Sequence, residues 1–289
     1  MQRKSRLSSR SSSPSARRTI DLSLLDPPDG ASLITRLRIA GCVFAEDEAQ
    51  VLLTSARTPT ELEQMVQQRV SGVPLEHVVG WAEFGGLRIA VEPGVFVPRR
   101  RSELLLREAV VLAPPQPVVV ELCCGSGALA LAVASTLHDV ELYATDVDPA
   151  AVRCARRNLS QLAASAGVLE GDLFEPLPHS LAGRVDLLLA NAPYVPTDAI
   201  SLMPPEARLY EPQLALDGGS DGLDVVRRIV AEATHWLAPT GHLLVETSRS
   251  QASAIVLALE RHRMAGRIVA SEELDGTAVI GCLASAADS

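Results

Sequence analysis

The chain has 289 residues, of which 47% are hydrophobic and 21% are charged, a composition typical of a globular protein with one large domain and a smaller second one. Six of its 26 basic residues lie within residues 3–18, so the remainder of the chain carries 20 basic against 35 acidic residues. A body this acidic repels a phosphate backbone, and nucleic acid is therefore a disfavoured partner.

A membrane protein and a disulfide or metal scaffold are also disfavoured. The longest nearly uncharged stretch, Gly125–Leu137, is shorter than the roughly 18 apolar residues that a membrane span needs. The basic amino-terminal segment lacks the apolar stretch of a secretory signal, so we expect a cytoplasmic protein that does not contact membranes. The five cysteines are odd in number and lack zinc spacing, which predicts neither disulfides nor a metal site.

The amino-terminal part divides into a tail and a helical domain. Residues 1–20 predict a disordered basic tail, because they are rich in serine and arginine and show no apolar periodicity. Residues 21–73 predict a small helical domain. Its clearest signal is Thr58-Pro59-Thr60-Glu61, a capping box with proline at the first helical position, and Gly72 marks the end of the helix that follows.

Residues 74–98 predict a β-hairpin that links the two domains. The pattern starts at Phe84-Gly85-Gly86-Leu87 and alternates between apolar and polar residues over Leu87–Val91. It continues through Glu92-Pro93-Gly94 into the apolar run Val95–Val97.

Residues 99–289 predict an α/β domain with an open, mostly parallel sheet, because short apolar runs alternate with amphipathic helical patterns. The seven expected strands are Val118–Leu122, Glu141–Thr145, a weak one near Val168, Val185–Ala190, His242–Thr247, Arg267–Ser271 and Ala278–Leu283. The expected helices are Ser102–Val111, Ala128–Leu137, Pro149–Ala163, Asp221–Leu237 and Gln251–His262.

The first candidate binding segment runs from Glu121 to Gly127 and joins a buried strand to a helix. Glycines at Gly125 and Gly127 allow a cofactor to approach the backbone at the carboxyl end of the strand. The segment lacks the third glycine of the dinucleotide motif and the lysine of a phosphate loop. Its acid, Glu121, suits a cationic sulfonium and amino group better than a pyrophosphate; a tight turn without a ligand is the alternative.

Two more acidic segments follow the next two expected strands. Asp146 lies about 20 residues after the glycines, where a carboxylate holds a ribose diol, and Asp148 is placed to cap the helix that begins at Pro149. Asp172 is placed to accept a hydrogen bond from an adenine amino group, with Leu173 and Phe174 beside the ring. An ordinary Gly-Asp turn is the alternative for this third segment.

The fourth segment is Asn191-Ala192-Pro193-Tyr194, which follows a strand expected to be fully buried. Asn191 supplies a side-chain carbonyl and Ala192 a backbone carbonyl, and Pro193 holds Ala192 in an extended conformation. Two convergent acceptors beside an aromatic ring predict a receptor for a planar NH2 group.

These four segments, in this order and spacing, resemble the class I S-adenosylmethionine-dependent methyltransferases, and the fourth resembles the Asn-Pro-Pro-Tyr motif of enzymes that methylate planar amino groups. With Pro74-Leu75-Glu76-His77, Phe96-Val97-Pro98-Arg99 and Glu211–Leu223, the chain is similar to the protein-(glutamine-N5) methyltransferases over about residues 29–283. The resemblance implies a seven-stranded, mostly parallel sheet with helices on both faces. It also implies that the helical domain engages a protein substrate.

The resemblance further implies methyl transfer from S-adenosylmethionine to the side-chain amide nitrogen of a glutamine, in a peptide chain release factor or another translation protein. The catalytic residues that it implies are Asn191, Ala192, Pro193 and Tyr194. The cofactor-binding residues that it implies are Glu121, Cys123, Gly125, Gly127, Asp146, Asp172, Leu173 and Asn191.

The chain departs from the family pattern at several positions. Ala192 replaces the first proline of the motif, Cys123 stands where glycine is usual, and Arg101 replaces an acid while Ser102 retains a hydroxyl. These departures leave the target protein open. Two other functions also stay open: N6-adenine methylation of RNA or DNA, for which residues 99–101 supply a basic cluster, and S-adenosylmethionine binding without turnover.

Overall fold

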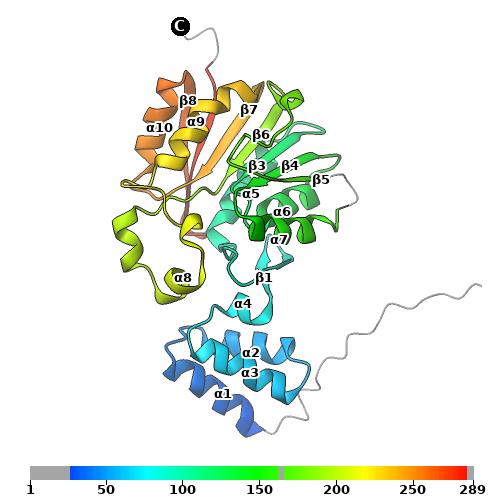
Figure 1. Ribbon diagram of the computed structural model, residues 1–289, viewed down its shortest axis with the longest axis vertical. Coiled ribbons are helices and arrows are strands. Elements are labelled where there is room, and N and C mark those ends of the chain that lie inside the picture. Colours follow the sequence, from blue (N-terminus) through cyan, green and yellow to red (C-terminus); the bar gives the residue numbers. More distant parts are fainter. Residues whose placement is uncertain (1–26, 163–165, 285–289) are drawn as a thin grey trace, which may run out of the picture. The chain divides into compact units, whose positions relative to one another are not determined.

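The computed structural model describes residues 27–162 and 166–284, and the expected basic tail over residues 1–20 lies outside them. The chain divides into two compact units, Met1–Ser71 and Gly72–Ser289, which are described separately (Figure 1). Among the described residues, no helix combines the length and the hydropathy that crossing a bilayer requires.

The described part of the first unit consists of the helices α1 (Pro27–Ile39), α2 (Ala45–Ser55) and α3 (Pro59–Val70). Their facing sides bury Leu33, Leu37, Ala45, Ala49, Leu52 and Val66. The predicted cap of α3 is present, since the Thr58 hydroxyl accepts the N–H of Glu61 at 3.1 Å. The carboxylate of Glu61 accepts the N–H of Arg57, one residue before the cap, so both side chains satisfy free amides at the helix start.

The second unit begins with a short helix, α4 (Leu75–Val79), which is followed by the predicted hairpin. Strand β1 (Trp81–Phe84) pairs with β2 (Leu87–Ala90) across Gly85-Gly86. Both glycines have positive φ, 57° and 73°, which is the backbone that a two-residue hairpin turn requires. Val95–Val97, which the sequence pattern also included, is not part of a strand.

The seven-stranded, mostly parallel sheet is confirmed. Its strands lie in the order β5-β4-β3-β6-β7-β9-β8, and β9 runs antiparallel to both of its neighbours. The strands are β3 (Val118–Leu122), β4 (Glu141–Asp146), β5 (Ala166–Glu170), β6 (Val185–Ala190), β7 (Leu237–Glu246), β8 (Met264–Ser271) and β9 (Gly276–Leu283).

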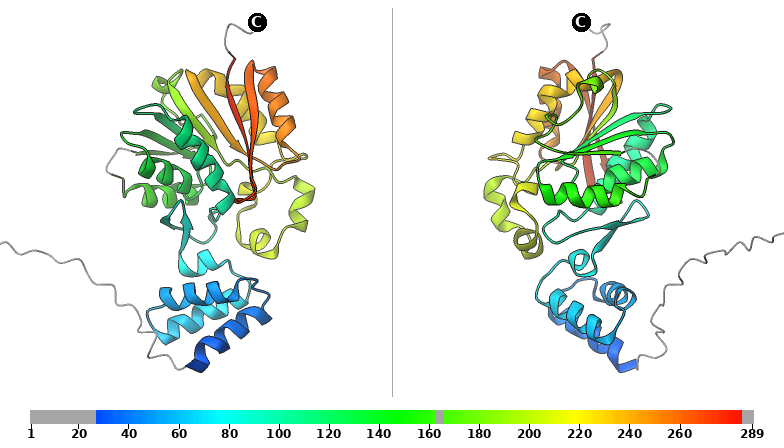
Figure 2. Two further views of the ribbon diagram at one scale, coloured as in Figure 1. Left: turned by 180° about the vertical axis from the view of Figure 1, so that it is seen from behind. Right: turned by 45° about the vertical axis from the view of Figure 1, so that its right-hand side comes forward.

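Helices cover both faces of this sheet, as the sequence predicts (Figure 2). Helices α5 (Glu103–Leu112), α6 (Ala128–Thr136) and α7 (Pro149–Leu159) pack on one face, and α9 (Asp224–Trp236) and α10 (Ala252–Arg261) pack on the other. Strand β3 is buried on both sides: Val119 points into the first core, and Val118, Val120 and Leu122 point into the second. This is why its sequence is apolar at every position except Glu121, rather than alternating.

The connection between β6 and α9 holds elements that the sequence pattern did not predict. It contains the short helix α8 (Pro205–Tyr210), and α9 begins at Asp224, three residues later than expected. The chain order of the sheet reverses at β3, whose neighbours are β4 and β6. In open parallel sheets a ligand binds at the carboxyl ends of the strands beside such a reversal.

Candidate functional site

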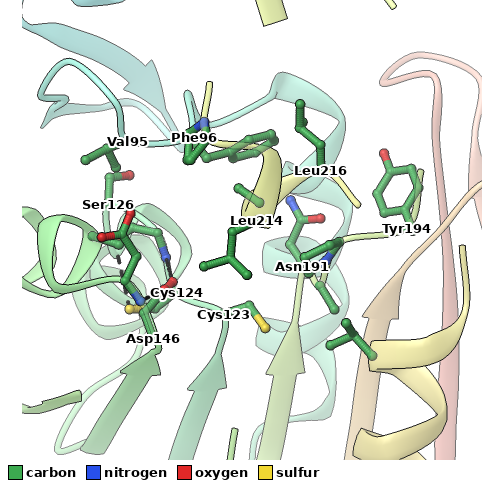
Figure 3. Close-up of a pocket in the computed structure, with 18 of the residues that line it drawn as sticks. Val95, Phe96, Cys123, Cys124, Ser126, Asp146, Asn191, Tyr194, Leu214 and Leu216 are labelled. Atoms are coloured by element: carbon green, nitrogen blue, oxygen red, sulfur yellow. Dashed lines mark hydrogen bonds between the residues drawn. The ribbon is translucent and has the colours of Figure 1, made fainter. Parts of the chain in front are cut away.

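A cavity of about 300 Å³ lies at the carboxyl ends of β3, β4 and β6, beside this reversal (Figure 3). It is lined by ten of the eleven residues predicted from the sequence: Glu121, Cys123, Gly125, Asp146, Asp172, Leu173, Asn191, Ala192, Pro193 and Tyr194. Further lining residues include Phe96, Arg99, Arg101, Ser102, Leu214 and Arg228. Asp146 lies at one end of the cavity and Asn191 and Tyr194 lie at the other.

Of the eleven catalytic and cofactor-binding residues implied by the resemblance, Gly127 is the one that does not line the cavity. It precedes α6 with φ 71°, and a Cβ atom at this position would lie 3.1 Å from the Cβ atom of Ala155 on α7. The glycine therefore allows α6 and α7 to pack closely, which is a structural role. Gly125, with φ 54°, does face the cavity, and its amide donates to the Asp146 carboxylate at 2.8 Å.

Cys123 takes a left-handed backbone conformation with φ 54°. This conformation explains why glycine suits the position, because a Cβ atom in this region strains the backbone of an L-residue. Burial and the acids around it raise the pKa of the Cys123 thiol, so the side chain is neutral. Its role at the cavity wall is that of a small apolar group.

Glu121 is the penultimate residue of β3 and is only 3% exposed. One of its carboxylate oxygens accepts the N–H of Ala130 at 2.9 Å, which satisfies a free amide in the first turn of α6. Burial, followed by the negative charge of Asp146, raises the pKa of Glu121 to about 8. A buried carboxyl of this kind favours a cationic group beside it, because that group stabilises the ionised form.

Asp146 ends β4 and is held by two backbone amides. Its oxygens accept the N–H groups of Gly125 at 2.8 Å and of Asp148 at 2.9 Å, which leaves each oxygen a further lone pair. Asp148 caps α7 by accepting the N–H of Ala150 at 2.8 Å, as predicted. Asp146 is therefore oriented by the backbone while it can still accept hydrogen bonds from a ligand.

The third segment matches its prediction only in part. Asp172 lies at the cavity and forms an ion pair with Arg228 of α9 at 2.7 Å. Leu173 lines the cavity, whereas Phe174 stacks on Trp236 with ring centroids 5.6 Å apart and belongs to the core. The expectation that Phe174 lies beside a ligand ring is therefore wrong.

The loop after β6 carries the fourth segment, and residues from distant parts of the chain hold it. The Asn191 side-chain amide donates to the hydroxyl of Ser102 at 3.1 Å. The Tyr194 hydroxyl donates to Glu246 at the end of β7 at 3.3 Å, and Arg101 donates to the same oxygen at 3.1 Å. Burial and the Glu246 carboxylate raise the pKa of Tyr194 to about 12, so the phenol is protonated.

The backbone of the Asn191–Tyr194 loop is also held in place, by Gln251 and by the segment that contains Gly218 and Gly222. The Gln251 amide donates to the carbonyl oxygens of Tyr194 and Asp221, each at 2.9 Å. A Cβ atom at Gly218 would lie 2.7 Å from the Pro193 carbonyl oxygen, and one at Gly222 would lie 2.2 Å from that of Tyr194. The glycine-rich segment is thus the support on which the Asn191–Tyr194 loop rests.

Sequence reasoning did not assign roles to the residues that hold the loop, namely Arg101, Ser102, Glu246 and Gln251. Ser102 is the residue among them that the sequence pattern indicates, since it retains the hydroxyl of the family motif. Glu246 carried a weaker signal, as an acid at the end of an apolar strand. Among residues 27–162 and 166–284, no group of three or more histidine, cysteine or acidic side chains is placed to hold a metal ion.

Comparisons with known proteins agree with this geometry. A family model described as "Methyltransferase small domain" matches residues 86–204. The chain is 40% identical over 192 residues to the release factor glutamine methyltransferase of Geobacter sulfurreducens, which covers 66% of each chain. It is 39% identical over 216 residues to that of Mycolicibacterium smegmatis, covering 74% of this chain and 75% of the relative. A methyltransferase structure from Pyrococcus furiosus shares the fold at 16% identity, with a TM-score of 0.55 over 77% of this chain and 100% of that one.

Proposed function

Because the chain belongs to the release factor glutamine methyltransferase family, we propose that it transfers a methyl group from S-adenosylmethionine to the side-chain amide nitrogen of a glutamine in a peptide chain release factor. The observation that carries the proposal is the placement of Asn191 and Tyr194 in the same cavity as the buried acids Glu121 and Asp146. One end of the cavity suits a cationic cofactor and the other suits a planar amide.

The cavity residues fit S-adenosylmethionine. Glu121 is a buried carboxylate suited to a cationic group, and Asp146 has free lone pairs for a ribose diol. Gly125 has no side chain, and the Cβ atom that it lacks would lie 4.0 Å from Phe96 on the opposite wall. When bound, the cofactor supplies an electrophilic methyl group on a positively charged sulfur.

At the acceptor end, the residues orient the amide rather than activate it. An amide nitrogen is a poor nucleophile, because its lone pair is delocalised into the carbonyl. The Oδ1 atom of Asn191 and the carbonyl of Ala192 accept the two N–H bonds of the substrate amide, and the ring of Tyr194 packs on its plane. Fixing the nitrogen in this way supplies the proximity and orientation that the reaction needs.

We assign the first unit to recognition of the protein substrate. Three apolar side chains around the α1–α2 connection are exposed, namely Ile39 at 83%, Val43 at 83% and Phe44 at 68%. A protein surface is the partner that such a patch suits.

The basic cluster at residues 99–101 does not favour a nucleic-acid substrate. Arg99 pairs with Glu211, Arg101 pairs with Glu246, and a nitrogen of Arg100 lies 3.9 Å from Glu273. Each arginine is matched by an acid, so the cluster presents little uncompensated positive charge to phosphates.

The test is methyl transfer from isotopically labelled S-adenosylmethionine to a purified release factor, with the modified residue mapped by mass spectrometry. A ribosomal protein and RNA are assayed in parallel as competing substrates. Asn191→Ala is expected to lower kcat on the order of 10²-fold with cofactor affinity retained. Asp146→Ala is expected to weaken cofactor binding in calorimetry. Labelled RNA, or label on no glutamine at all, would contradict the proposal.

A further inference from the structure

We infer that Ser102 is a positioning residue for the proposed reaction, because its hydroxyl accepts the Asn191 side-chain N–H and so holds the amide in place with its oxygen free for the acceptor. The inference rests on the proposed function. It concerns how Asn191 is oriented and not which protein is methylated.

The contact is specific and buried. Ser102 is 4% exposed, lines the cavity, and accepts the Asn191 side-chain N–H at 3.1 Å from a position 89 residues earlier in the chain. It ends the short 3-10 turn Arg100–Ser102, where its own amide donates to the carbonyl of Arg99 at 2.9 Å. The turn therefore fixes the Ser102 backbone beside the cavity.

Ser102 also precedes α5 directly, where a serine ordinarily caps the helix. Its side chain makes no capping hydrogen bond. The hydroxyl contacts Asn191 instead of a backbone amide of α5. Ser102 has helical backbone angles, φ −68° and ψ −12°, so it continues the turn into α5 rather than capping the helix, and its hydroxyl contacts the site.

The chemistry explains why this contact matters. The two ends of an Asn side chain differ in polarity: Oδ1 only accepts hydrogen bonds and Nδ2 only donates them. With Nδ2 bound to Ser102, Oδ1 is the end that remains for a substrate NH2 group, and in Figure 3 it lies on the side of Tyr194. If the Asn191 amide were reversed, its NH2 group would face the NH2 group of the substrate glutamine. Two donors cannot form a hydrogen bond, so binding of the substrate amide would be lost.

The test compares Ser102→Ala, Ser102→Thr and Asn191→Ala with the double variant Ser102→Ala/Asn191→Ala in the full-length enzyme. We expect Ser102→Ala to lower kcat about two- to tenfold, the effect of one hydrogen bond, with the Kd for S-adenosylmethionine unchanged. Ser102→Thr restores the hydroxyl and should restore kcat. In the Asn191→Ala background, adding Ser102→Ala should change kcat no further, since the two residues act as one unit.

Three outcomes would overturn the inference: wild-type kcat in Ser102→Ala, an equal loss from Ser102→Ala in both backgrounds, or a Thr variant as slow as the Ala variant. If Ser102→Ala fails to fold, as judged by its melting curve, Ser102→Cys keeps the size with a much weaker acceptor and is expected to show the same loss. A wild-type enzyme that methylates no glutamine would overturn the proposed function instead. The two failures are therefore distinguishable.

Discussion

Arg99 and Glu211 form a two-pronged ion pair in which one guanidinium nitrogen lies 2.6 Å and 2.7 Å from the two carboxylate oxygens. The Glu211 side chain is 1% exposed, and one of its oxygens also accepts the N–H of Val97 at 3.2 Å. The pair joins the residues that precede the Arg100–Ser102 turn to the segment that supports the Asn191–Tyr194 loop. Two walls of the cavity are thereby held together across 112 residues of sequence.

Replacing one partner of this pair is expected to destabilise the fold. Arg99→Ala leaves Glu211 buried without its cation, and such losses amount to about 3–5 kcal/mol. Arg107→Ala is the matched control, because Arg107 pairs with Glu273 through two exposed side chains and its loss should change stability little. Urea unfolding at pH 7 measures both. Similar losses from the two variants would show that burial of Glu211 is unimportant.

Glu121 gives a pH dependence with a defined sign. Its pKa is about 8 in the folded chain and 4.5 as an unperturbed carboxyl, so the folded state binds an extra proton between these values. The contribution of Glu121 to stability is therefore complete below about pH 4.5 and is lost as the pH rises toward 8. Relative to Glu121→Gln, the wild type should lose stability between pH 5.5 and pH 8.

Urea unfolding of both proteins at the two pH values measures this difference. Glu260→Gln, at an exposed position on α10, is the control for the same substitution outside the cavity. Binding of S-adenosylmethionine should also release a proton from Glu121, because a cation favours the carboxylate. Calorimetry in buffers of different ionisation enthalpy detects that proton, and its absence would contradict contact between the cation and Glu121.

The sequence predicted the parts of the fold that are set by local patterns. Strands β3 and β6 were predicted to the residue, because each is an apolar run bounded by polar or turn residues. The hairpin was predicted from a pattern with two glycine-containing segments, and its turn lies at Gly85-Gly86, where both residues have positive φ angles. Helix α8 has six residues, too few for a periodic pattern to be recognised.

The same reasoning explains what was predicted of the candidate site. Residues at the carboxyl ends of neighbouring parallel strands converge for any sheet of this topology, so Glu121, Asp146 and Asn191 were expected together. The contacts that hold the loop depend on pairs far apart in sequence. Asn191 is 89 residues from Ser102, and Tyr194 is 52 residues from Glu246. Periodic sequence patterns indicate local structure and cannot predict pairs so far apart.

Cys123 and Cys124 offer a test of backbone strain at adjacent positions. A left-handed backbone costs an L-residue about 1–2 kcal/mol of stability. Glycine removes this strain, but its greater conformational freedom in the unfolded chain cancels part of the gain. Cys123→Gly is therefore expected to leave stability unchanged or raise it by about 1 kcal/mol, with cofactor affinity retained. Cys124 is 5% exposed and lies outside the left-handed region, so Cys124→Gly should destabilise. If thermal unfolding showed the two variants to be equally destabilised, the left-handed backbone of Cys123 would not be strained.

Gly222 is expected to be essential to the supporting segment, because it combines a positive φ of 77° with close contact to the Asn191–Tyr194 loop. A Cβ atom at this position would lie 2.2 Å from the Tyr194 carbonyl oxygen and 2.3 Å from Nε2 of Gln251. Gly222→Ala must therefore displace the loop or break the hydrogen bond between Gln251 and Tyr194. We expect a lower kcat for methyl transfer, since a small displacement of an orienting loop reduces the rate on the order of 10²-fold.

The Gly183→Ala variant is the control that distinguishes the steric clash expected at Gly222 from the cost of a left-handed alanine. Gly183 has a similar φ of 70°, but a Cβ atom there would have no neighbour within 4 Å. Both variants should lose the stability that a left-handed alanine costs, about 1–2 kcal/mol, and this loss appears in thermal unfolding. Only Gly222→Ala should also lose methyl transfer at temperatures where the protein remains folded. If the two variants kept the same kcat, the glycine-rich segment would not be the support of the loop, and Gln251 alone would have to hold it.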